Sequence, residues 1–117
     1  EALNAYLHAL AATPSPVGLL GAIYIIEGTG QRIIPALLPL LKAQLGPHLP
    51  ASAFRFLDYH GENDVHHLAR WVSAVTLVLE LDPGERADQA IIDTARNTAE
   101  LYLLQLTDAY APRRDTP

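Results

Sequence analysis

The amino-acid sequence predicts an all-α protein built as an antiparallel helical bundle. Half of its 117 residues are hydrophobic and only 18% are charged, which is enough apolar material for the core of one domain. Apolar residues recur at steps of three and four, the period of a helix that buries one face. Runs of alternating polarity and Asn-Gly or Asp-Gly hairpin turns are absent from the sequence, so no sheet is expected.

A proline-rich stretch over residues 13–16 separates the first two predicted helices. Residues 2–12 form a short first helix, and the second spans about 16–45. Ser15 is the expected N-cap of the second helix, with Pro16 at the first helical position, where proline is favoured. These signals place the first helix boundary within a few residues.

Two prolines lie inside the second predicted helix. Pro35 and Pro39 each remove a backbone hydrogen-bond donor, so we expect this helix to bend. Gly46 and Pro47 follow the last apolar residues and end the helix.

Two further helices complete the predicted bundle. The third spans about 51–81, and Gly61 within it weakens the helix by about 1 kcal/mol relative to alanine, which would suit a kink or a break. A turn over residues 82–84 leads to the last helix, at about 84–110. Short connections of this kind favour antiparallel neighbours.

Composition excludes several classes of function. The net charge of −5 and the lack of a basic run argue against a nucleic-acid partner. The sequence has no cysteine, which excludes disulfides, thiolate metal sites and a cysteine nucleophile. No apolar run is long enough to span a bilayer, so we expect no membrane partner and a cytoplasmic location.

Three metal-ligating residue types share one face of the third predicted helix. His60, Asp64 and His67 follow i, i+4 and i+7 spacing, which places them within about 60° of one another, whereas His66 points away. Two imidazoles and a carboxylate suit iron, manganese or zinc. The alternative is a solvated polar surface, but Trp71 continues the same face, which favours an inward orientation.

Glu27 is a second candidate, because it interrupts an apolar part of the second predicted helix. A buried carboxylate is costly unless it is paired or binds a metal. Gly28 and Gly30 remove side-chain bulk beside it, so a helix or a ligand can approach. The alternatives are a salt bridge to Arg32 or Arg55, or exposure on the outer face of the helix.

Three segments and one histidine resemble a known family. Residues 25–31, residues 42–46, residues 56–64 and His67 are similar to the haem-oxygenase-like iron-containing redox enzymes, also called haem-oxygenase-like di-iron oxidases. The resemblance covers about residues 17–80. It implies a helical fold like that of haem oxygenase, non-haem iron that includes the di-iron form, and activation of dioxygen to oxidise a small organic molecule.

The resemblance also implies a role for each candidate. Glu27 matches the carboxylate that bridges or caps the irons, and His60, Asp64 and His67 match the three ligands on the late helix of the family. The family draws further ligands from earlier helices. We therefore expect a fragment of a longer domain, its C-terminal part without the N-terminal helices, and a partial metal site. A homo-oligomer or a second polypeptide would supply the missing helices.

These observations favour a non-haem iron-dependent oxidase or oxygenase whose partners are dioxygen and a small-molecule substrate. Two alternatives stay open at the level of the sequence. One is a non-catalytic helical interaction or dimerisation module with a degenerate metal site. The other is a mononuclear zinc or iron hydrolase that uses only His60, Asp64 and His67.

Overall fold

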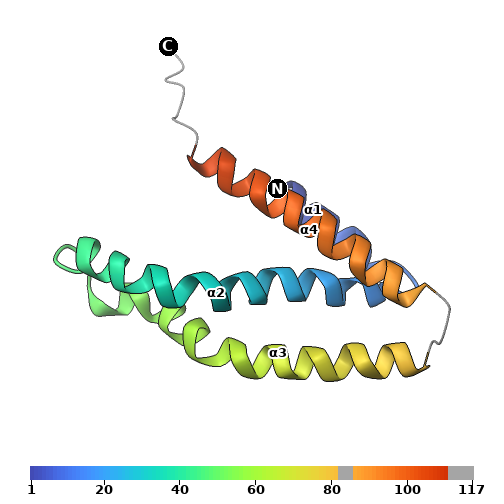
Figure 1. The fold of residues 1–117 in the computed structure, drawn as a ribbon. Helices are drawn as coiled ribbons and strands as arrows, with labels where there is room; N and C mark the ends of the chain where they lie inside the picture. Colours follow the sequence, from blue (N-terminus) through green and yellow to red (C-terminus); the bar gives the residue numbers. More distant parts are fainter. Residues whose placement is uncertain (82–85, 111–117) are drawn as a thin grey trace, which may run out of the picture. The chain divides into compact units, whose positions relative to one another are not determined.

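The computed structural model describes residues 1–81 and 86–110, without the side chains of residues 62–65. Over this part of the chain the protein is all-α, with no strand, as predicted. The elements, shown in Figure 1, are α1 (Ala2–Ala11), η1 (Pro16–Gly18), α2 (Leu19–Leu45), η2 (Ala51–Phe54), α3 (Arg55–Leu81) and α4 (Ala87–Tyr110), where η marks a 3₁₀ helix.

The predicted helix positions agree with these bounds, and the differences lie in the first turns. The second and third predicted helices each begin with a 3₁₀ turn, η1 and η2, before the α-helix starts. Ser15 is the N-cap of η1 with Pro16 next to it, but its hydroxyl makes no capping hydrogen bond, contrary to expectation. The predicted turn at 82–84 lies outside the described residues.

Neither the prolines nor the internal glycine ends a helix. α2 continues through Pro35 and Pro39, and α3 continues through Gly61, so of the kink or break expected at Gly61 the break does not occur. A helix packed along its length against another helix keeps its conformation despite the loss of single hydrogen bonds. Among the helices as described, none is long and apolar enough to cross a lipid bilayer.

Backbone contacts divide the chain into two compact units. The first contains residues 1–22 together with the segment that carries α4, and the second contains residues 23–83. α2 therefore begins in the first unit and continues through the second.

The first unit depends on close backbone contact between the start of α2 and α4. A Cβ atom on Gly18 would lie 2.5 Å from Thr94 Oγ1, and one on Gly21 would overlap the carbonyl oxygen of Ile91. Only glycine allows an approach this close. The buried residues of this unit are Gly18, Gly21, Ala22, Ala87, Ile91, Thr94 and Thr98.

In the second unit, α3 packs antiparallel against the part of α2 that follows residue 22. The Tyr24 and Trp71 rings lie 4.8 Å apart between centroids. Further along the same interface, a Cβ atom on Gly61 would lie 3.3 Å from Ile34 Cγ2, so the helices approach closely there. As residue numbers rise along α2, the contacted residue numbers fall along α3.

An ion pair and a buried aromatic ring lie near the turn that connects α2 to α3. Lys42 Nζ donates to Asp58 Oδ1 at 2.6 Å, and both side chains are more than 40% exposed. Phe54, in η2, is 6% exposed. Together these contacts hold the start of α3 against the end of α2.

Candidate metal centre

Glu27 faces α3, and the side chain that it approaches there is a histidine. Glu27 Oε1 lies 3.5 Å from His67 Nδ1, and the two side chains are 30% and 29% exposed. The carboxylate is therefore neither on the outer face of α2 nor paired with Arg32 or Arg55 among the described residues.

The separation of these two atoms fits two ligands of one metal ion. It is longer than an ordinary N–H···O hydrogen bond, which measures about 2.7–3.2 Å. Two donors that each lie about 2.1 Å from one metal ion are about 3.0 Å apart at the 90° angle of an octahedral site and about 3.4 Å apart at the tetrahedral angle. Imidazole nitrogen and carboxylate oxygen are also the donors that iron accepts. On this observation, the Glu27–His67 pair fits a metal ion.

His60 lies in a different environment, against two rings of its own helix. Its ring centroid is 4.4 Å from that of Phe56 and 5.6 Å from that of Tyr59. Within the part of the chain whose side chains are described, no three His, Asp or Glu residues form a group that could hold a metal ion. Glu27, His60 and His67 therefore do not form a three-ligand site by themselves. The Asp64 side chain lies outside the described residues.

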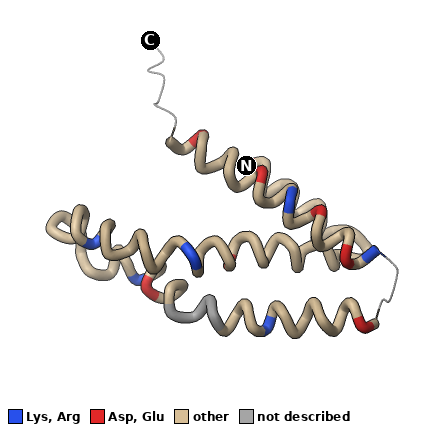
Figure 2. Tube along the Cα trace, in the orientation of Figure 1, with Lys and Arg blue, Asp and Glu red and all other residues tan. Residues whose placement is uncertain are grey.

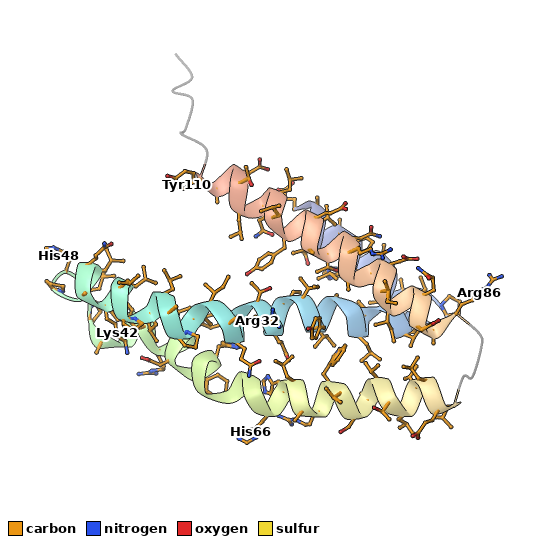
Figure 3. The ribbon with its side chains drawn as sticks, in the orientation of Figure 1. Arg32, Lys42, His48, His66, Arg86 and Tyr110 are labelled. Atoms are coloured by element: carbon orange, nitrogen blue, oxygen red, sulfur yellow. The ribbon has the colours of Figure 1, made fainter. Side chains whose placement is uncertain are left out.

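His66 provides the contrast that helical spacing predicts. It is exposed, and Figure 3 shows it on the side of α3 that faces away from α2. Its Cα is adjacent to that of His67, so the two histidines differ in the face they occupy and not in their place along the helix. This makes His66 a matched control for His67.

The family comparison concerns the chain as a whole. The sequence model of a family described as iron-containing redox enzyme matches residues 1–103. The chain belongs to this family. The match includes α1 and most of α4, so it extends beyond the 17–80 segment in which the resemblance was noted. No curated protein and no solved structure gives a significant match to the chain.

An aromatic pair lies next to the Glu27–His67 pair in this iron-containing redox family member. Tyr24 is one turn before Glu27 on α2, and Trp71 is one turn after His67 on α3, with their rings tilted by 35°. Trp71 was expected near this face from its spacing. The position of Tyr24 beside Glu27 was not predicted. The i, i+3 spacing of the two residues on one helix could have indicated it.

A small hollow adjoins the same turn of α2. It has a volume of about 100 Å³, and its lining includes Tyr24, Gly28 and Arg32. A water molecule occupies about 30 Å³ in the liquid, so the space suits a few waters or one small group. A Cβ atom on Gly28 would meet only Leu68 Cδ2, at 4.0 Å. Gly28 is therefore not required for the approach of α3 and leaves open space beside Glu27.

Proposed function

We propose that this protein is a non-haem iron-dependent oxidase or oxygenase that activates dioxygen to oxidise a small organic substrate. The observation that carries the proposal is the 3.5 Å separation of Glu27 Oε1 and His67 Nδ1 between α2 and α3. Membership of a family of iron-containing redox enzymes supports it.

The proposed ligands are Glu27, His60, Asp64 and His67. For Glu27 and His67 the support is the separation of Oε1 and Nδ1, and for His60 and Asp64 it is helical spacing and family resemblance. Two imidazoles and two carboxylates suffice for one divalent ion, and manganese or zinc could occupy the same donors. Two irons need more ligands than four residues provide, so a di-iron form would draw the others from a second polypeptide or a second copy.

Each group of this chain has a distinct task in the proposed site. The carboxylate of Glu27 offsets the charge of the cation, and His67 contributes a neutral imidazole. Both side chains keep about 30% of their surface exposed, which leaves room for dioxygen and substrate. The Tyr24–Trp71 pair places two aromatic rings beside the adjoining turn. Iron, when bound, supplies the redox chemistry.

A ferrous titration under anaerobic conditions tests the proposal. Trp71 is the only tryptophan in the sequence and lies one turn from His67, so its fluorescence reports on binding at this site. We expect saturable quenching with one iron or fewer per chain. Glu27→Gln and His67→Ala should abolish this quenching, whereas His66→Ala should retain it. Exposure of the loaded protein to dioxygen, followed by optical spectroscopy, then tests redox chemistry.

A non-catalytic interaction module with a degenerate metal site is the second candidate. It is favoured by the absence of a three-ligand group among the described side chains. If neither the wild type nor any variant responds to ferrous iron, the result argues against the oxidase and favours the module. Equal iron binding by wild type and His67→Ala would instead show that the metal lies elsewhere.

A further inference from the structure

Two aromatic rings flank the proposed ligand pair within the second unit. Tyr24 lies three residues before Glu27 on α2, and Trp71 lies four residues after His67 on α3. Residues at these spacings are neighbours on a helix, with about 5–6 Å between their Cβ atoms. The ring centroids of Tyr24 and Trp71 lie 4.8 Å apart, one helical turn from the ligand pair along the same interface. All four residues belong to the compact unit of residues 23–83.

These rings are also the readily oxidised side chains of this part of the chain. The sequence has no cysteine and no methionine, the sulfur residues that oxidants commonly attack. Trp71 is its only tryptophan. The other tyrosine of residues 23–83 is Tyr59, which lies eight residues, or about 12 Å along the helix axis, before His67. Within this unit, an oxidant that forms at the ligand pair therefore has Tyr24 and Trp71 as its nearest donors.

The segments that carry the rings have little charge. Residues 23–26 include no charged residue, and the charged residues of 68–81 are Arg70 and Glu80. Figure 2 shows how sparse charge is on this part of α3. A bound cation takes up the charge of Glu27, so a positive charge on an oxidised indole would have no free anion beside it in these segments. A radical without charge is therefore favoured, and a phenol reaches that state when it loses an electron and a proton together.

We propose that the Tyr24–Trp71 pair donates one electron to the proposed metal site when no substrate is bound, and that Tyr24 holds the resulting radical. The proposal rests on the proposed function, because dioxygen at that site is the oxidant. One electron leaves the pair and reduces the oxidised site by one step. Tyr24 loses one electron and its phenolic proton and becomes a neutral phenoxyl radical. Where Trp71 is oxidised first, an electron from Tyr24 restores it across the ring contact.

The hollow beside Tyr24 offers a place for the proton acceptor. Its volume is about 100 Å³, its lining includes Tyr24, Gly28 and Arg32, and it has room for a few water molecules. Water in this hollow can take the phenolic proton and pass it to the solvent. The reaction therefore balances as one electron to the metal site and one proton to water.

The alternative is that the ring contact only packs α2 against α3, as aromatic pairs commonly do. Tyr24→Phe separates the two interpretations, because it keeps the ring and removes the hydroxyl group. Packing alone predicts no effect of this substitution on a radical. Tyr59→Phe is the matched control, because Tyr59 lies 12 residues before Trp71, about 18 Å along the axis of α3. Circular dichroism checks that both variants stay helical.

Pulse radiolysis of the metal-free full chain tests electron transfer within the pair. Azide radicals oxidise tryptophan in preference to tyrosine at neutral pH, so they produce the indolyl radical of Trp71 first. In the wild type we expect its absorption to decay as phenoxyl absorption rises, at a rate independent of protein concentration. In Tyr24→Phe the indolyl radical should persist at least tenfold longer, whereas Tyr59→Phe should behave as the wild type. Equal decay in Tyr24→Phe and in the wild type would overturn the proposal.

Freeze-quench electron paramagnetic resonance tests the donation to the metal site. The full chain is loaded with ferrous iron under anaerobic conditions and then mixed with dioxygen in the absence of substrate. We expect a tyrosyl radical signal, narrowed by ring-deuterated tyrosine, in the wild type and in Tyr59→Phe. Tyr24→Phe should lower this signal at least tenfold.

The two experiments separate this inference from the proposed function. If iron binds and dioxygen oxidises it, but no radical signal depends on Tyr24, the inference is wrong and the iron chemistry stands. If no iron binds, the proposed function fails and the inference fails with it, even where radiolysis shows transfer from Tyr24 to Trp71. A signal that depends on Tyr24 in both experiments supports the inference.

Discussion

Glu27 Oε1 on α2 lies 3.5 Å from His67 Nδ1 on α3, and both side chains are partly exposed to solvent. A carboxylate that pairs with a histidine competes with any metal for that histidine. The two atoms nevertheless stand farther apart than in an ordinary hydrogen bond. We therefore expect an added metal ion to bind between them without large rearrangement.

Metal affinity should fall as the solution is acidified. Iron binds neutral imidazole, so protons compete with the metal for histidine. Titrations of Trp71 fluorescence at about pH 7.5 and about pH 5.5 measure the change. An equal affinity at the two pH values would show that histidine is not a ligand.

Two glycines of α2 should respond oppositely to alanine. Gly21→Ala forces a methyl group against the Ile91 carbonyl and to within 2.8 Å of the Ala95 nitrogen, so we expect a loss of about 1–3 kcal/mol in the free energy of unfolding. Gly28→Ala meets only Leu68 and should gain up to about 1 kcal/mol from helix propensity. Chemical denaturation measures both. If Gly28→Ala also weakens iron binding, the open space beside Glu27 is needed by the ligand.

Thr98→Val should stabilise the first unit. The Thr98 side chain is fully buried, and its Oγ1 has no hydrogen-bond partner among the described residues. An isosteric replacement removes the desolvated hydroxyl, and the expected gain is about 1 kcal/mol. Thr107→Val is the control, because Thr107 is exposed on the same helix and its Oγ1 donates to the Leu103 carbonyl. A lower melting temperature for Thr98→Val would contradict the assignment.

The Lys42–Asp58 ion pair should contribute little to stability. Both side chains are more than 40% exposed, and exposed pairs contribute between about 0 and 1 kcal/mol. A double-mutant cycle with Lys42→Ala and Asp58→Ala measures the coupling, which should decrease further in high salt. A coupling well above 1 kcal/mol that resists salt would indicate a site less solvated than its exposure suggests.

The helices and their faces could be predicted because both depend on local chemistry. The proline-rich stretch at 13–16 and the Gly-Pro at 46–47 mark helix boundaries, and the cost of burying the Glu27 carboxylate predicts that it faces a partner. The 3₁₀ turns at η1 and η2 could not be predicted, because periodicity shows which face is buried and not how the first turn is hydrogen-bonded.

The histidine that meets Glu27 could not be predicted either. His60 and His67 occupy the same face of α3 but lie about 10 Å apart along its axis. Only one of the two histidines can lie opposite Glu27 along the axis of α3. The register of α2 against α3 decides which one, and this register depends on contacts such as Gly61 with Ile34. Helical spacing alone carries no information about that axial position.

The antiparallel register of α2 and α3 also has a consequence for the order of folding. Lys42 and Asp58 are 16 residues apart in the chain, whereas Glu27 and His67 are 40 apart. Closing the longer loop costs about 0.8 kcal/mol more in chain entropy, so contacts near the turn are expected to form first and those of Glu27 and His67 later. A cation held by this pair would link the two helices in the part of the hairpin that lies far from the turn and forms late.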